Sequence, residues 1–220
     1  MKELSQVLSK ATSCIEWRYF HLAVDGGPPI YRERVYCYEL YHQMRSVWPD
    51  HCPYYLNGEV DKRAHPILTK LGVGGIPDLL VHQPGDMAGN YAIIEVKNAL
   101  VGTSGIKNDL QKLTRFVSTA RYRRAIYLVY GAKGDDRLVD TISRCARNIP
   151  DLASIELWVH RQPQRPAVHL TTLSEGWGRL DDDSDVIVVT VAEPVEGHRS
   201  SARGRPSTHL LPLSFYVRPL

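Results

Sequence analysis

Several features that would assign this chain to a common class are scarce or absent. No apolar run approaches the roughly 20 residues of a membrane-spanning helix, and the first residues do not have the pattern of a signal peptide. The four cysteines form no C-x-x-C pair, and no H-E-x-x-H or phosphate-loop motif is present. The net charge of +3 is too small to indicate a nucleic-acid partner by itself. We therefore expect a cytoplasmic protein with reduced thiols, and no membrane or nucleotide-binding segment.

The rest of the composition is typical of a compact globular protein with one main domain. With 220 residues, of which 43% are apolar, the chain can bury a substantial core without disulfides. Apolar residues at helical spacing predict four helices, at residues 4–13, 32–48, 105–119 and 136–148. Apolar runs bounded by turn residues predict five strands, at residues 54–61, 76–82, 91–97, 125–130 and 155–159, while residues 16–24 are expected to be extended. The mixture predicts an α/β fold.

The chain changes character beyond residue 161. Residues 162–166 have the composition of a linker, residues 186–189 are a candidate strand, and residues 198–207 are rich in Arg, Ser, Gly and Pro. A segment of that last composition cannot bury enough apolar surface to order itself. We therefore expect a main domain over residues 1–162 and a partly flexible C-terminal extension over residues 163–220.

A predicted β-hairpin brings together Asp78 and the triplet Glu95-Val96-Lys97. Residues 76–82 and 91–97 are its two strands, and the loop between them contains Pro84, Gly85 and Gly89. If the hairpin closes symmetrically about this loop, His82 faces Tyr91 and Asp78 faces Glu95. Side chains alternate along a strand, so Lys97 lies on the same face as Glu95, about 7 Å along it. Two carboxylates and one ammonium group then converge.

Such a cluster predicts a cation site. Carboxylates that lie close together repel each other and shift each other's pKa, so the arrangement is costly unless a cation or a positioned amine offsets it. Mg²⁺ prefers carboxylate oxygens and keeps several waters, and it is therefore the cation that Asp78 and Glu95 suggest.

The same residues resemble a family signature. Pro77-Asp78 followed by Glu95-Val96-Lys97 resembles the PD-(D/E)XK motif of the restriction-endonuclease-like nucleases. The predicted order from residue 32 to residue 160, helix, three strands, helix, strand, helix, strand, is similar to the αβββαβ core of that fold. The resemblance implies a mixed central sheet flanked by helices and a metal-dependent nuclease that uses Mg²⁺ or Mn²⁺.

The resemblance also implies roles for individual residues. Asp78, Glu95 and the Val96 carbonyl would hold the metal ion, which lowers the pKa of bound water and neutralises charge on the phosphate. Lys97 would orient the attacking water or stabilise the transition state. Without that chemistry, Asp78 would be a turn residue and Lys97 would form a simple salt bridge.

A third catalytic acid is expected from the helix before the sheet. Many nucleases of this superfamily supply such an acid, and the match here is Glu39, which lies at the margin of the apolar stripe of residues 36–47. Glu39 would complete the metal shell or bind a water in it. The alternative is that Glu39 lies on the helix surface and pairs with Gln43.

A nuclease also needs cations for the phosphate backbone of its substrate. Basic residues follow the motif closely in sequence, and the expected nucleic-acid-binding residues are Lys107, Lys112, Arg115, Arg121 and Arg123. Lys112 and Asp109 lie on one flank of the predicted helix, where the alternative is a solvated surface. Gln111 is followed four residues later by Arg115 and not by Tyr, which argues against the exonuclease branch of the superfamily.

The sequence therefore favours a Mg²⁺-dependent endonuclease that acts on DNA. The main alternative is a catalytically idle nucleic-acid-binding or scaffolding subunit of a larger defence or mobile-element assembly. A second alternative is a junction-resolving nuclease that acts as a homodimer. The sequence does not decide between a monomer, a homodimer and a larger complex.

Overall fold

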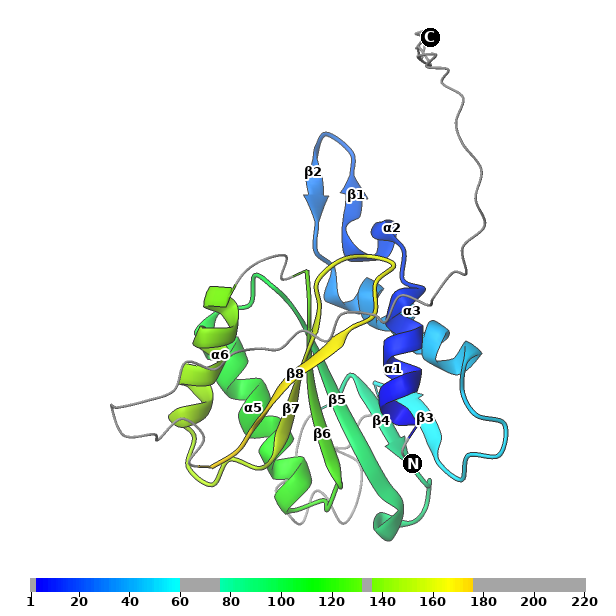
Figure 1. Ribbon diagram of the computed structural model, residues 1–220, viewed down its shortest axis with the longest axis vertical. Helices are drawn as coiled ribbons and strands as arrows, with labels where there is room; N and C mark the ends of the chain where they lie inside the picture. Colours follow the sequence, from blue (N-terminus) through cyan, green and yellow to red (C-terminus); the bar gives the residue numbers. More distant parts are fainter. Residues whose placement is uncertain (1–2, 60–75, 132–135, 176–220) are drawn as a thin grey trace, which may run out of the picture. The chain divides into compact units, whose positions relative to one another are not determined.

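The computed structural model describes residues 3–59, 76–131 and 136–175 (Figure 1). The candidate strand at residues 186–189, the segment 198–207 and the last residues of the expected strand 54–61 lie outside these described residues.

A six-stranded mixed sheet, in the order β3-β4-β5-β6-β7-β8, forms the centre of the described structure. Strands β3, β4 and β5 are antiparallel, β5, β6 and β7 are parallel, and β8 is antiparallel to β7. The strands are β3 (Tyr55–Gly58), β4 (Leu79–His82), β5 (Asn90–Asn98), β6 (Arg124–Tyr130), β7 (Ile155–His160) and β8 (Val168–Leu173). A short 3-10 helix, η1 (Met87–Gly89), lies in the loop between β4 and β5.

Parallel neighbours require crossover connections, which here are helical. Helix α5 (Thr103–Ser118) joins β5 to β6, and α6 (Asp136–Arg147) joins β6 to β7. Both helices therefore begin near the C-terminal ends of the parallel strands.

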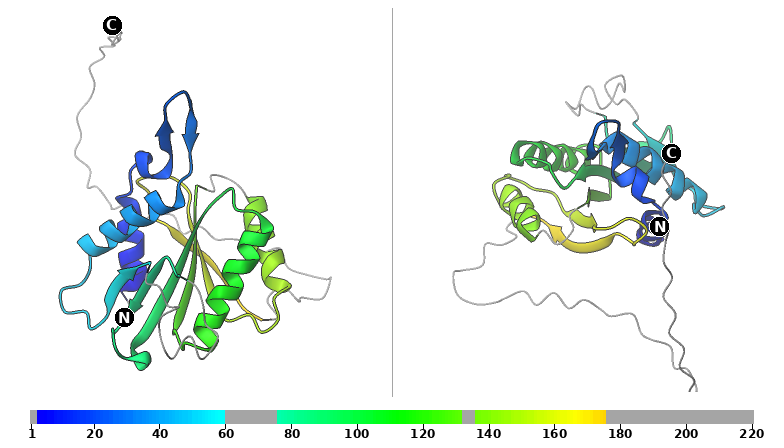
Figure 2. Two further views of the ribbon diagram at one scale, coloured as in Figure 1. Left: turned by 180° about the vertical axis from the view of Figure 1, so that it is seen from behind. Right: turned by 90° about the horizontal axis from the view of Figure 1, so that it is seen from above.

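Helices cover both faces of the sheet (Figure 2). On one face, apolar residues of α5 and α6 form a core with residues of β5, β6 and β7, which includes Ile106 of α5, Ile93 of β5 and Tyr127 of β6. The other face is covered by α1 (Leu4–Ser13), α2 (Trp17–Phe20) and α3 (Glu33–Ser46), which form a second core. Because side chains alternate along β5, Glu95 and Lys97 point toward α5, while Val96 points toward α3.

The predicted mixed α/β architecture is confirmed, and two local expectations are wrong. Residues 16–24 are not one extended segment, because they contain α2 and β1 (Leu22–Val24), which pairs with β2 (Gly27–Ile30). The sheet also continues past the expected boundary at residue 162, because β8 pairs with β7. The expected linker, residues 162–166, is tied to the N-terminal region by a hydrogen bond from Gln164 N to Ile15 O at 2.9 Å, and the next residue, Ala167, donates its N–H to Thr12 Oγ1 at 2.8 Å. None of the described helices is long and apolar enough to cross a membrane.

Candidate active site at the ends of strands β4 and β5

The register of the β4–β5 hairpin brings Asp78 to the end of β5. Leu79 pairs with Ile94 and Leu80 pairs with Ile93, so continuing this register by one residue sets Asp78 opposite Glu95. The expected pairing of His82 with Tyr91 is wrong, because His82 pairs with Asn90 across a register shift. An irregularity beside the loop absorbs one residue and leaves the register near Asp78 as the sequence predicted.

Asp78 is held by the backbone of the opposite strand. Its Oδ2 accepts a hydrogen bond from Val96 N at 2.7 Å. Strand β4 begins only at Leu79, so no backbone carbonyl of β4 is paired with Val96 N. The Asp78 carboxylate accepts this N–H instead. The N–H and C=O of one strand residue point toward the same neighbouring strand. The Val96 carbonyl therefore points to the same side of β5 as its N–H, toward Asp78. It is a second oxygen donor beside the Asp78 carboxylate.

Glu95 is a fully buried acid with an incomplete set of partners. Its exposed fraction is 0%, and Oε2 forms an ion pair with Lys112 Nζ at 2.7 Å. Neither oxygen accepts a well-oriented hydrogen bond from the described residues, and Oε1 has no ion-pair partner among them either. Burial, and then the charge of Asp78, raise the pKa of Glu95 well above its usual range, and Lys112 offsets only part of this. An ionised Glu95 is therefore costly without a further cation.

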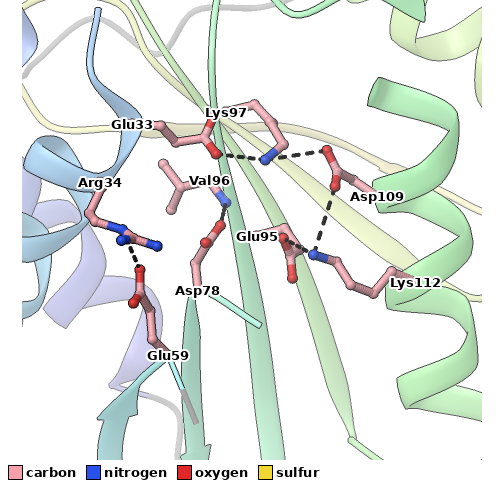
Figure 3. A network of polar contacts seen from close by, with 9 residues as sticks. All are labelled: Glu33, Arg34, Glu59, Asp78, Glu95, Val96, Lys97, Asp109 and Lys112. Carbon is pink, nitrogen blue, oxygen red and sulfur yellow. Dashed lines mark hydrogen bonds and ion pairs between the residues drawn. The ribbon is translucent and has the colours of Figure 1, made fainter. Parts of the chain in front are cut away.

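Lys97 is fixed between two carboxylates (Figure 3). Its Nζ lies 2.7 Å from Glu33 Oε1 and 3.7 Å from Asp109 Oδ2, and its side chain is 19% exposed. Burial by itself would lower the pKa of Lys97, but the hydrogen bond with Glu33 and the charges of Asp109, Glu33 and Asp78 raise it above its ordinary value. Lys97 is therefore an ammonium ion at neutral pH.

Helix α5 supplies one acid and one base to the same cluster. Asp109 and Lys112 are three residues apart, so they project from one flank of the helix, with Nζ 3.8 Å from Asp109 Oδ1. Burial raises the pKa of Asp109 to about 6, although Lys97 and Lys112 oppose the change. Asp109 is buried because it lies within the apolar stripe of α5, three residues after Ile106 and four before Leu113.

The charges of this cluster do not balance. It contains four carboxylates and two ammonium groups, from Glu33, Asp78, Glu95, Asp109, Lys97 and Lys112 (Figure 3). With every group ionised the net charge is −2, which one divalent cation would neutralise. At the margin of the cluster, Arg34 and Glu59 form a separate ion pair at 3.1 Å.

The expected helix acid lies elsewhere. Glu39 accepts a hydrogen bond from Gln43 Nε2 at 2.7 Å, which is the surface pairing that the sequence left open as an alternative. The acid of α3 that reaches the cluster is Glu33, in the first turn of the helix. Glu39 is six residues further on, which turns it by about 240° and moves it by about 9 Å along the axis. Glu33 lies three residues before Tyr36 and seven before Leu40, so the apolar stripe contained the signal for it.

The expected nucleic-acid-binding residues do not form one group. Lys112 belongs to the buried cluster, whereas Lys107 and Arg115 are exposed on α5. Arg121 and Arg123 are exposed just before β6, whose first residue, Arg124, pairs with Ala92. They therefore lie near the start of the parallel strands, whereas Glu95 lies toward their end. Ala92, which pairs with Arg124, is about 10 Å along β5 from Glu95. They are close to the motif in sequence but not in space, because α5 returns the chain to the start of the parallel strands.

A cavity of about 330 Å³ opens beside Asp78 on the side of α3. It is also lined by Tyr38, Tyr41 and Glu59. Tyr38 is 58% exposed at its rim. A polar ligand that approached Asp78 from this side would meet aromatic as well as charged side chains.

The oxygen donors fit a magnesium ion better than a transition metal. Within the described residues, no three His, Cys, Asp or Glu side chains gather as a ligand set. Mg²⁺ does not need such a set, because it is usually bound through one or two carboxylates and keeps several waters. Asp78, the unpartnered Oε1 of Glu95 and the Val96 carbonyl are donors of that kind.

Comparison with known proteins identifies no relative. No family model matches the chain, and no curated protein or solved structure is significantly similar to it.

Proposed function

We propose that this protein is a Mg²⁺-dependent nuclease with a restriction-endonuclease-like core, which cleaves phosphodiester bonds within DNA. The observation that carries the proposal is the arrangement of Asp78 opposite Glu95, with the Val96 N–H bound by Asp78 and Lys97 on the Glu95 face. The order of the described elements from α3 to β7 supports the same fold family, because these elements follow the helix, three strands, helix, strand, helix, strand pattern.

In this proposal Asp78, Glu95 and the Val96 carbonyl hold the metal. When bound, Mg²⁺ would lower the pKa of a coordinated water and neutralise charge on the scissile phosphate. The net charge of −2 on the surrounding cluster supports a divalent ion. The raised pKa of Glu95 means that a proton competes for this site in the absence of metal.

Lys97 acts as a hydrogen-bond donor and not as a base. Its raised pKa keeps it protonated, so it can stabilise negative charge that develops on the phosphate or orient a water. Glu33 is a positioning residue, because its carboxylate holds Lys97 Nζ at 2.7 Å. Lys112 has the equivalent role for Glu95.

The alternative of an idle nucleic-acid-binding or scaffolding subunit is favoured by a different observation. Each lysine of the cluster already pairs with carboxylates. Lys97 pairs with Glu33 and Asp109, and Lys112 pairs with Glu95. A self-contained network of this kind could persist for stability alone.

Incubation with nucleic acids separates the two functions. Supercoiled, linear, single-stranded and branched DNA, and RNA, would each be incubated with the purified protein in Mg²⁺, Mn²⁺ or EDTA. The proposal predicts that supercoiled circles are nicked or linearised only when metal is present. DNA binding without cleavage of any substrate in either metal would favour the idle subunit. Cleavage that persists in EDTA would exclude the metal-dependent mechanism.

A further inference from the structure

Helix α6 carries a row of arginines on its exposed side. Arg137, Arg144 and Arg147 are exposed and line a groove of about 680 Å³. Arg137 and Arg144 are seven residues apart, which sets them on the same side of the helix about 10.5 Å from each other. Arg147 follows about one turn later. We call these three residues the arginine face.

The rest of α6 shows why this side remains exposed. Leu138, Ile142 and Ala146 are spaced four residues apart and are buried in the core shared with α5. That apolar stripe lies on the other side of the helix from Arg137 and Arg144. The helix is therefore anchored by one side, and the arginine face is free of any packing role.

The positive charge of the arginine face is not neutralised. None of its arginines forms an ion pair within the described part of the chain, and Arg144 donates only to Thr141 Oγ1, at 3.2 Å. Asp140 lies in the same groove and leaves a net charge of +2 there. By contrast, the half-buried Arg124 is fully engaged, with both Glu156 oxygens at 2.7 and 2.8 Å.

The arginine face lies beside the helix that carries part of the candidate active site. Cys145 Sγ is 3.8 Å from the carbonyl of Thr103, the first residue of α5. Burial raises the pKa of the Cys145 thiol, while the charges of Arg144 and Lys107 lower it, so the exposed Lys107 is close to this surface. Neighbouring helices are 8–10 Å apart. The arginine face is therefore about one helix diameter beyond the helix that presents Lys112 to Glu95.

We propose that the arginine face binds the phosphodiester backbone of duplex DNA, without reading its sequence, and directs it toward the candidate active site. Arginine suits this role because its planar guanidinium pairs with phosphate oxygens in a bidentate manner. The inference rests on the proposed function for its substrate, but it concerns binding and can be tested without cleavage.

The test compares full-length proteins in EDTA, where the proposed nuclease is inactive. Binding of a labelled duplex would be measured by fluorescence anisotropy from 50 to 200 mM NaCl for wild type and for R137Q/R144Q/R147Q. Each phosphate contact contributes about 0.9 to the slope of log affinity against log salt, so three lost contacts should make it shallower by about 2.7. The ratio of the DNA affinity of wild type to that of the variant should then fall about 40-fold between 50 and 200 mM NaCl.

Two further variants serve as controls. R121Q/R123Q removes two exposed arginines that precede β6 and are not part of the arginine face, and it should leave the slope nearly unchanged. R137K/R144K/R147K keeps the charges and should retain most of the salt dependence. Circular dichroism would verify that each variant is folded. Since every protein carries the full chain, contributions from other residues are common to all.

An unchanged slope in R137Q/R144Q/R147Q, or a loss confined to R121Q/R123Q, would overturn the inference. This outcome is distinct from failure of the proposed function, in which wild type binds the duplex through the arginine face but cleaves no substrate in Mg²⁺. Failure of wild type to bind duplex DNA at 50 mM salt would also overturn the inference.

Discussion

Replacing Asp109 by Asn should stabilise the metal-free protein at neutral pH. Asp109 is 7% exposed, and its burial is the main cause of a pKa raised from 3.8 to about 6. Below pH 3.8 the acid is neutral in both the folded and the unfolded state. Between pH 3.8 and about 6 the folded state binds more protons than the unfolded state, so the free energy of unfolding falls as pH rises. At 1.36 kcal/mol for each pKa unit, the total loss is roughly 3 kcal/mol.

The neutral amide of Asp109→Asn avoids this loss. The variant should resemble wild type near pH 4 and be more stable by up to about 3 kcal/mol at pH 7.5, equivalent to about 6 to 12 °C in unfolding midpoint. Urea unfolding in EDTA at several pH values would measure the difference. Asp140→Asn, at an exposed acid on α6, is the matched control and should change stability by less than about 0.5 kcal/mol. A variant less stable than wild type at pH 7.5 would show that ionised Asp109 is a net stabilising partner of the two lysines.

Three further outcomes are expected. Mg²⁺ at a hundred times its dissociation constant should stabilise wild type by about 2.7 kcal/mol in thermal melts. Asp78→Asn should melt at a higher temperature than wild type in EDTA and should be stabilised much less by Mg²⁺. If Mg²⁺ stabilised the variant as much as wild type, Asp78 would be excluded as a ligand. Calorimetry in buffers of different ionisation enthalpy should show that Mg²⁺ binding releases more protons at pH 6 than at pH 8, because the pKa values of Glu95 and Asp109 are raised. Tyr36→Phe removes a buried 2.6 Å hydrogen bond to Nδ1 of His160 and should cost about 1–3 kcal/mol in urea unfolding, whereas a neutral effect would mean that the imidazole finds another partner.

The sequence predicted the hairpin because two local features specify it. Alternation along the strands and the loop between them set the register that brings Asp78 opposite Glu95. The irregularity at His82 is not visible in the sequence, because a symmetric loop and a loop with one absorbed residue differ only in local backbone geometry. Strand β8 was missed because it is a half-exposed edge strand, whose mixed pattern resembles that of a loop.

The partners of the site were harder to predict than its centre. Glu33 lies on the margin of the apolar stripe of α3, but the resemblance to known nucleases implied Glu39, in the middle of the helix. Lys112 was expected to meet the substrate, and it is instead paired with Glu95, because sequence alone does not show which flank of a helix faces the sheet. Arg121 and Arg123 were placed by nearness along the chain, which the direction of α5 reverses.

The Glu33 and Glu39 assignments can be compared in cleavage. The structure pairs Glu33 with Lys97 and Glu39 with Gln43, so Glu33→Gln should lower the cleavage rate and Glu39→Gln should leave it nearly unchanged. The opposite order would restore the sequence-based assignment.

The most direct test of the proposed nuclease is a single-turnover cleavage assay of wild type and Lys97→Met in Mg²⁺, with DNA affinity measured in parallel. Lys97 is proposed to act on charge that develops only in the transition state, so its loss should affect turnover and not affinity. We expect Lys97→Met to cleave at least about 100-fold more slowly than wild type, with a dissociation constant within about threefold of the wild-type value. A variant that cleaves at the wild-type rate, in a preparation free of contaminating nuclease, would contradict the proposal.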